Sequence, residues 1–320
     1  MKFYLKKIFT LIITLFIISG ITFFVFEIIP GDRVLNVLGT DATPEMVEAM
    51  REELGLNRPV TVRYADWLKD AVKGDFGTSY NYSVEVSSLL KDKLPVTLTL
   101  AAMSLILIIF ISFPLGILWA SVKKPGGRKD TIVGILSQII MSIPSFFLGI
   151  IIIWVLGIIL KVFAPGGYIS YSKDMTGFIK YMFFPAVTIA ISKSAQVVRF
   201  LRNSLIKEKK ADYVRTAYSK GATPKKVMYG HVLRNGMIPV VTFLGTIVAD
   251  VMAGSIVVEQ VYSVPGIGRL LITSISTRDF PVVQAIILYI VFIIIIVNFV
   301  VDMLYQLLDP RISQGHDNLK

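Results

Sequence analysis

Long, nearly uncharged apolar stretches recur along this chain, and each is a candidate to cross a lipid bilayer as a helix. A spanning helix needs about 20 predominantly apolar residues. Six stretches approach or exceed this length, at 8–29, 96–120, 131–161, 181–198, 237–261 and 282–308. With 54% hydrophobic residues and a mean hydropathy of +0.68, the 320-residue chain has more apolar surface than a soluble core of its size would bury. The sequence therefore predicts an all-α integral membrane protein with six transmembrane helices.

The ends of two stretches are poorly defined by the sequence. The third contains Pro144, which predicts a kink, and the fourth is short and carries Lys193. The first stretch follows Lys2, Lys6 and Lys7, as the core of a signal peptide would. It is longer than such a core, however, and no small-x-small cleavage site follows it. We expect it to remain as a transmembrane helix.

Lysine and arginine are distributed unevenly between the connecting segments, and cytoplasmic loops of membrane proteins carry the excess. The N-terminus carries three, 122–130 carries four and 199–234 carries ten. By contrast, 162–180 and 259–281 carry two each. Both termini are therefore predicted to be cytoplasmic. The same bias explains the net charge of +11, so nucleic acid is not implied as a partner.

The segment between the first two apolar stretches is long enough to fold as a small α-helical exterior insertion. Thr43 can cap a helix that starts at Pro44 and ends at Gly55, and a second helix is expected over 59–73. A folded exterior segment of this kind suggests a docking surface for another protein. The predicted division of the chain is an N-terminal transmembrane helix at 1–30, the exterior subdomain at 31–95, a five-helix core at 96–308 and a cytoplasmic tail at 309–320.

Two short helices are predicted in the polar, basic segment 211–240, between the fourth and fifth stretches. Asp212 is a suitable N-cap for the first helix, and Gly221 supplies a left-handed residue just past its end. Thr223 can cap the second helix, with Pro224 in its first turn. Charge alone favours a basic loop that lies on anionic lipid. The fixed caps favour a rigid projection that binds a partner.

This basic segment also resembles a motif of a known family. "RTAYSKGATPKKVMYGHVLRNGMIP" is similar to the EAA loop of bacterial ABC-importer permeases, in which an alanine, a glycine four residues later and a downstream proline recur. Ala217, Gly221 and Pro239 occupy those places. Arg215 and Thr216 depart from the general motif but are similar to its peptide and nickel branch. Four other segments resemble the permease subunit of that branch with the large first exterior loop: "EIIPGD", "LGLNRPVTVRYADWLKDAVKGDFGTS", "VEQVYSVPGIGRLLITSISTRDFPVVQ" and "LLDPRI".

The resemblance implies one half of a transmembrane channel in a bacterial cell membrane. In that family two homologous permeases pair, each coupling loop (203–236 here) seats on one of two cytoplasmic ATPase subunits, and an exterior binding protein delivers the cargo. ATP and Mg would be bound by the ATPases, and this chain would hold no cofactor. The cargo implied is a peptide, a nickel complex or another small solute. The residues implied to couple to the ATPase are Asp212, Tyr213, Arg215, Thr216, Ala217, Gly221 and Ala222.

The sequence lacks the motifs of the enzyme classes that we considered. It contains no G-x-x-x-x-G-K-[ST] loop to hold nucleotide phosphates. Its two histidines lie outside H-E-x-x-H, and G-x-S-x-G is absent, so neither a catalytic nor a metal site is predicted. An ion-coupled secondary transporter is the alternative, because Glu27, Asp250 and Asp302 lie in or beside apolar stretches. That class usually shows an internal repeat, and we find none.

Charged residues near the ends of the apolar stretches have a simple interpretation. Glu27 and Asp302 are expected to be solvated at the membrane interfaces. Lys193 is expected to reach the cytoplasmic surface by snorkelling.

Two stripes of residues with a spacing of four run along the fifth stretch. The first consists of small residues that let helices approach closely, Gly245, Ala249 and Ala253. The second is predicted to line a polar translocation path and consists of Thr246, Asp250 and Gly254. A carboxylate near the middle of an apolar helix needs water or a partner. Asp250 therefore either pairs with a group on the second permease or lines the path.

Overall fold

The computed structural model describes residues 2–28, 34, 38, 42–53, 55–122 and 126–308. Predictions about the tail at 309–320, the motif residues at 29–32 and the side chain of Asp302 lie outside this description. The chain forms two compact units. One combines 1–97 with 265–295, and the other combines 98–264 with the chain from 296 onward. The predicted division of the chain into transmembrane, exterior and cytoplasmic parts stays a prediction.

Five helices in the described residues are long and apolar enough to cross a membrane, and a bent pair raises this number to six if it counts as one span. The five segments are Lys7–Ile28, Val86–Ala120, Met175–Glu208, Pro224–Val261 and Phe280–Val301. Each of them overlaps most or all of one predicted stretch, so five of the six stretches are accounted for. The prediction of an all-α integral membrane protein is confirmed.

The third predicted stretch is broken rather than kinked. Helices α6 (Arg128–Ser142) and α7 (Ser145–Ile152) meet at an angle of 92°, and a π-helical segment (Ile153–Ile159) continues α7. Proline disfavours helical backbone in the residue before it. Accordingly Ile143 has ψ 120° and Pro144 has ψ 140°. Two consecutive extended residues turn the chain instead of bending one helix.

The first unit contains the segment that was predicted to be exterior, and the helix caps of this segment follow the prediction. Its helices are α1 (Lys2–Ile28), α3 (Pro44–Glu53), α4 (Val60–Val72), the start of α5 (Val86–Ala120), α12 (Ile267–Ser276) and the part of α13 (Phe280–Leu308) up to residue 295. The Thr43 Oγ1 accepts a hydrogen bond from the Met46 N–H at 3.4 Å. Gly55 and Gly74, with φ of +65° and +85°, follow α3 and α4. These are local interactions, which is why the sequence predicted them.

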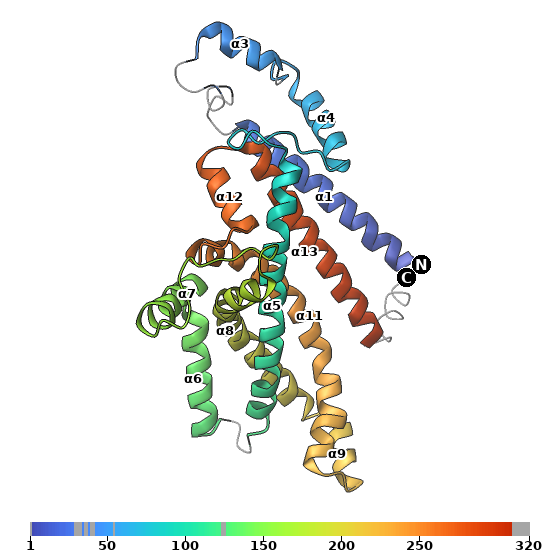
Figure 1. Ribbon diagram of the computed structural model, residues 1–320. Coiled ribbons are helices and arrows are strands. Elements are labelled where there is room, and N and C mark those ends of the chain that lie inside the picture. Colours follow the sequence, from blue (N-terminus) through green and yellow to red (C-terminus); the bar gives the residue numbers. More distant parts are fainter. Residues whose placement is uncertain are drawn as a thin grey trace. The chain divides into compact units, whose positions relative to one another are not determined.

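Helix α4 lies beside α1 (Figure 1), and aromatic rings pack between the two helices. The Phe23 ring lies 5.4 Å from that of Tyr64 and 5.6 Å from that of Trp67, between centroids. Arg63 on α4 forms an ion pair with Glu27 on α1. Glu27 was predicted to be solvated at the membrane interface, but it is bound to Arg63 of α4 instead.

A fully buried carboxylate anchors the loop before α5 to the start of α13. Both oxygens of Asp279 accept hydrogen bonds from the loop: Oδ2 from the Ser79 hydroxyl at 2.5 Å and Oδ1 from the Tyr80 N–H at 3.1 Å. The Asn81 N–H adds a third bond at 3.2 Å. Sequence reasoning missed this contact because about 200 residues separate the partners.

Replacing Asp279 by alanine is expected to loosen this loop. Three donors lose their acceptor in a buried place, which predicts a loss of about 3 kcal/mol in the free energy of unfolding. Thermal unfolding of the purified protein and protease cleavage within 76–85 measure it. Asp75→Ala is the control, because Asp75 accepts one exposed bond from the Gly77 N–H in the same loop. Equal melting temperatures for the two variants would contradict the assigned role of Asp279.

The second unit is built around the long helix α8 (Met175–Glu208), which contacts α6, α7 and α11 (Leu233–Val261). Figure 1 shows α9 (Asp212–Ser219) beyond the first turns of α11. Helix α10 (Pro224–Val227) and a π-helical segment (Met228–Val232) lead without interruption into α11. The predicted order of elements, two short helices followed by the fifth span, is confirmed.

Candidate functional site: a capped helix pair and an intramembrane ion pair

A glycine turn connects α9 and α10 with the geometry that the sequence predicts. Gly221 has φ of +79°. Its N–H donates to the Tyr218 carbonyl at 2.9 Å, and the Ala222 N–H donates to the Ala217 carbonyl at 3.1 Å. These two bonds form a Schellman motif, in which a left-handed residue closes the helix. The Thr223 hydroxyl then caps α10 by accepting from the Lys226 N–H at 3.4 Å.

The predicted N-cap of α9 is wrong by one residue. Ala211 is the cap, since its carbonyl already accepts a hydrogen bond from the Val214 N–H at 3.0 Å. Asp212 is therefore the first helical residue and makes no side-chain cap. Its carboxylate still lies at the positive end of the helix dipole, where a negative charge is favourable.

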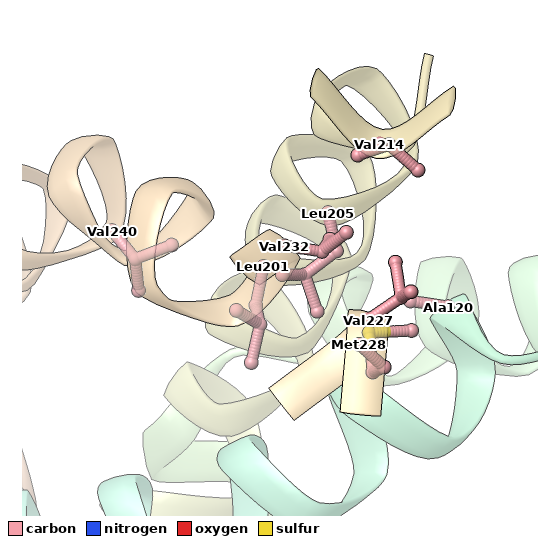
Figure 2. Packing of buried hydrophobic residues seen from close by; sticks show 8 residues of the cluster. All are labelled: Ala120, Leu201, Leu205, Val214, Val227, Met228, Val232 and Val240. Atoms are coloured by element: carbon pink, nitrogen blue, oxygen red, sulfur yellow. The ribbon is translucent and has the colours of Figure 1, made fainter. Parts of the chain in front are cut away.

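Eight buried residues hold the helix pair against the membrane helices, as Figure 2 shows. The end of α5 and helix α8 contribute Ala120, Leu201 and Leu205. The residues from α9 through α11 are Val214, Val227, Met228, Val232 and Val240. We call this set the coupling cluster. It joins α9 and α10 to the ends of three long helices, so the helix pair is fixed to the membrane helices rather than free to lie on lipid.

Two polar contacts at the end of α8 reinforce the coupling cluster. The Tyr213 hydroxyl donates to Glu208 Oε1 at 2.7 Å. Burial, together with this bond to a carboxylate, raises the pKa of Tyr213 to about 12, so the phenol is protonated throughout the physiological range. The Lys209 ammonium donates to the Ala120 carbonyl at 2.5 Å, and burial lowers the pKa of Lys209.

The predicted coupling residues divide into an outward set and a packing set. Asp212, Arg215, Thr216 and Gly221 are exposed. Ala217 and Ala222 pack against the coupling cluster instead, and Tyr213 is half-buried. Sequence reasoning missed two aromatic residues of the outward surface, Tyr218 and Tyr229, which are about half exposed. Exposed tyrosines in a polar segment are typical of protein interfaces, and this pattern could have identified the two residues from the sequence.

A second buried cluster near the helix pair was not predicted at all. Asp130 Oδ1 accepts hydrogen bonds from the Trp119 indole and from Arg202 Nη2, both at 2.6 Å. Arg202 Nη2 also lies 2.6 Å from Asp130 Oδ2, and its guanidinium carbon lies 4.6 Å from the Trp119 ring centroid. The Gly126 N–H donates to Oδ2 at 2.7 Å. The cluster joins α5, α6 and α8 near the end of α8 that holds the helix pair.

The predicted intramembrane charge, Asp250, has a partner within its own chain. The Lys193 ammonium on α8 lies 2.8 Å from Asp250 Oδ2 on α11. The prediction that Lys193 snorkels to the cytoplasmic surface is therefore wrong, because a carboxylate on the neighbouring helix is within its reach. A partner for Asp250 is thus present on α8, whereas the two predicted alternatives, a group on a second permease or a place on the polar path, stay predictions. Sequence reasoning treated the two charges separately and so missed the pair.

The stripe of small residues on α11 is packed at one end only, because Gly245 is buried, Ala249 is half-buried and Ala253 is exposed. A methyl group at Gly245 would lie 3.1 Å from Val301, which shows the close approach to α13 that a small residue permits. Thr246 and Asp250 are exposed on the described chain. Gly254 is half-buried, and a methyl group there would meet the Ser145 hydroxyl at 4.0 Å. The structure thus places the polar stripe on a face that stays partly open.

Comparison with known proteins gives consistent results along the chain. Residues 112–314 match the family model "Binding-protein-dependent transport system inner membrane component", and residues 1–101 match the model of the corresponding N-terminal region. A probable peptide ABC transporter permease, y4tP of Sinorhizobium fredii, is 33% identical over 96% of this chain and 98% of its own length. The oligopeptide permease AppB of Bacillus subtilis is 36% identical, over 93% and 95%. The dipeptide permease DppB of Lactococcus lactis is 32% identical, over 97% and 99%.

Proposed function

The chain belongs to the family of binding-protein-dependent transport system inner membrane components, and from this premise we propose that it forms half of the translocation path of an ATP-driven peptide importer. The named relatives are peptide, oligopeptide and dipeptide permeases, which supports peptides as the cargo. A nickel complex, which the family resemblance also allows, has no such support. The chain is a multi-pass membrane protein. We propose that both of its termini are cytoplasmic.

Helices α9 and α10 are the proposed contact with a separate ATPase subunit. Two observations together carry this proposal: the turn at Gly221 is closed by hydrogen bonds, and the residues that join the helix pair to the membrane helices are buried. The Schellman motif at Gly221 fixes the tip, and the coupling cluster fixes the base to α5, α8 and α11. A rigid projection can transmit a displacement from a partner, whereas a flexible loop would absorb it. In this arrangement the ATPase subunits bind ATP and Mg, and this chain supplies no cofactor site.

The proposed partners follow from the same arrangement. A second, homologous permease completes the path, two ATPase subunits bind the projections, and an exterior binding protein delivers the peptide. The exterior segment with α3 and α4 is the proposed dock for that protein, because Arg63 and the aromatic residues of α4 fix it to α1. The path is proposed to follow the stripe of Thr246, Asp250 and Gly254 on α11.

Replacing Gly221 by valine is expected to abolish ATP-driven uptake while the complex still reaches the membrane. A non-glycine residue in the left-handed region costs about 1–2 kcal/mol, which displaces the tip. Gly230→Val is the matched control. A methyl group at either glycine would have no neighbour within 4 Å, but only Gly221 has a positive φ. Peptide uptake by vesicles with ATP and binding protein is the measurement.

The outcomes also separate the importer from the ion-coupled alternative. Normal uptake by Gly221→Val would contradict the coupling role of the turn. Uptake by the parent that needs a proton or sodium gradient but neither ATP nor binding protein would contradict the importer and support a secondary transporter.

A further inference from the structure

The ion pair between Lys193 and Asp250 is the chemically most distinctive feature of the second unit. Lys193 lies midway along α8. Asp250 lies within α11, about 16 Å from the end of that helix at Val261. Both helices are long and apolar enough to span a membrane. The ammonium and carboxylate are 2.8 Å apart, and the two side chains are 18% and 51% exposed.

The face of α11 that carries Asp250 is open along several turns. Thr242, Thr246, Ala253 and Val257 are exposed on the same side of the helix as Asp250. A half-exposed carboxylate on a spanning helix is too costly to face lipid, so this face meets water or another protein. A water-filled path between two permeases satisfies this requirement.

The exposure of the pair also determines how easily it can exchange partners. A fully buried ion pair is lost only at a large cost, because a desolvated charge is left behind. An ion pair with one well-exposed member adds little to stability. A second ammonium group can therefore replace Lys193 on Asp250 with little loss, and it releases the Lys193 ammonium for a second carboxylate.

Two stacked aromatic rings lie between α8 and α11, on the side of the charged pair that is nearer the coupling cluster. The rings of Phe200 and Phe243 lie 4.2 Å apart between centroids and 10° from parallel. Each phenylalanine is seven residues from its charged neighbour, Phe200 from Lys193 and Phe243 from Asp250, which is about two helical turns or 10 Å. Phe200 also packs against the coupling cluster. The stacked rings thus lie between the charged pair and the coupling cluster, which Phe200 contacts.

We propose that Lys193 and Asp250 form a transient binding site for the free ends of a peptide in transit. Asp250, the more exposed partner, binds the α-ammonium group, and Lys193 binds the α-carboxylate. A peptide with free ends carries both charges on one molecule, so it can pair with both residues once the flexible Lys193 side chain has moved away from Asp250. This inference rests on the proposed function and identifies the chemical groups that its path recognises.

The absence of cysteine from the chain allows a direct test. Thr246 lies one turn from Asp250 on the exposed face, so Thr246→Cys places a unique thiol of this chain beside the site. The assembled complex in vesicles is treated with a small methanethiosulfonate that carries a trimethylammonium group. Labelling of this chain is measured with trialanine, or with trialanine whose ends are acetylated and amidated.

Trialanine is expected to slow labelling by roughly threefold or more, and the capped peptide to have little effect. Adding Lys193→Gln with Asp250→Asn should remove the protection. The charge exchange Lys193→Asp with Asp250→Lys preserves the pair and should retain it. Equal protection by both peptides, no protection by either, or protection that survives the neutral double variant would overturn the proposal.

The comparison of the two peptides in Thr246→Cys alone decides the result if a variant of the pair fails to assemble. ATP-driven uptake of trialanine by the same complex tests the proposed function separately. Uptake without end-dependent protection contradicts only the assignment of the site, whereas an assembled complex without uptake of any peptide contradicts the importer itself.

Discussion

A carboxylate introduced at Val227 is expected to release α9 and α10 from the membrane helices. Val227 is 1% exposed and contributes to the coupling cluster that Figure 2 shows. An ionised side chain buried there without a partner costs several kcal/mol. Helix α10 is the first turn of the continuous helix Pro224–Val261, and helix ends open more readily than helix interiors. The cost is therefore met by local detachment rather than by burial of the charge.

Hydrogen exchange of the assembled complex measures this detachment. In Val227→Asp, amides from Val214 to Met228 should exchange about 100-fold faster, which corresponds to roughly 3 kcal/mol. The ATPase should no longer co-purify. Lys225→Asp is the control, because it adds an acidic group to the same helix at an exposed position. Unchanged protection in Val227→Asp, or equal loss in both variants, would show that the coupling cluster does not hold the helix pair.

Removing either partner of the Asp130–Arg202 pair is expected to destabilise the second unit by about 3 kcal/mol, at the lower end of the range for buried pairs. The two side chains are 10% and 15% exposed, so solvent compensates a part of the loss. Asp130→Ala also leaves the Trp119 indole without its acceptor. Arg202→Met leaves the carboxylate with two neutral donors, Trp119 and Gly126.

A double-mutant cycle separates the pair from its surroundings. Thermal unfolding of Asp130→Ala, of Arg202→Met and of the double variant should show a double loss clearly smaller than the sum of the single losses. Arg199→Met is the control, since Arg199 is exposed and its bond to Gln138, at 2.5 Å, joins the same two helices, α6 and α8. Additive losses would mean that the contact between Asp130 and Arg202 contributes nothing of its own.

The features that the sequence predicted well depend on neighbours within a few residues. The caps at Thr43 and Thr223 and the left-handed glycines at positions 55 and 221 are set by one turn of backbone. The apolar stretches are likewise predictable because a span requires only length and composition. The cap of α9 shows the limit of this reasoning, because Ala211 and Asp212 are adjacent and the sequence alone favoured the wrong one.

The third apolar stretch shows how a local rule can be correct in kind and wrong in size. Pro144 predicts a disturbed helix, and the helix is disturbed there. The angle of 92° between α6 and α7 follows from two extended residues in succession. Their conformation is stabilised by the contacts of α7 with α8 and α11, which no local pattern contains.

What the sequence by itself determined is therefore the class of the protein, its spanning helices and the capped pair near residue 221. Only the tertiary structure decided which charges meet. Asp130 and Arg202 are 72 residues apart, and Lys193 and Asp250 are 57 apart. The same is true of Ala217, which resembles an outward motif residue and packs against the coupling cluster. The physical reason is that a side chain's energy in a membrane depends on the partner that packing brings to it, and helices far apart in sequence supply that partner only after they have packed.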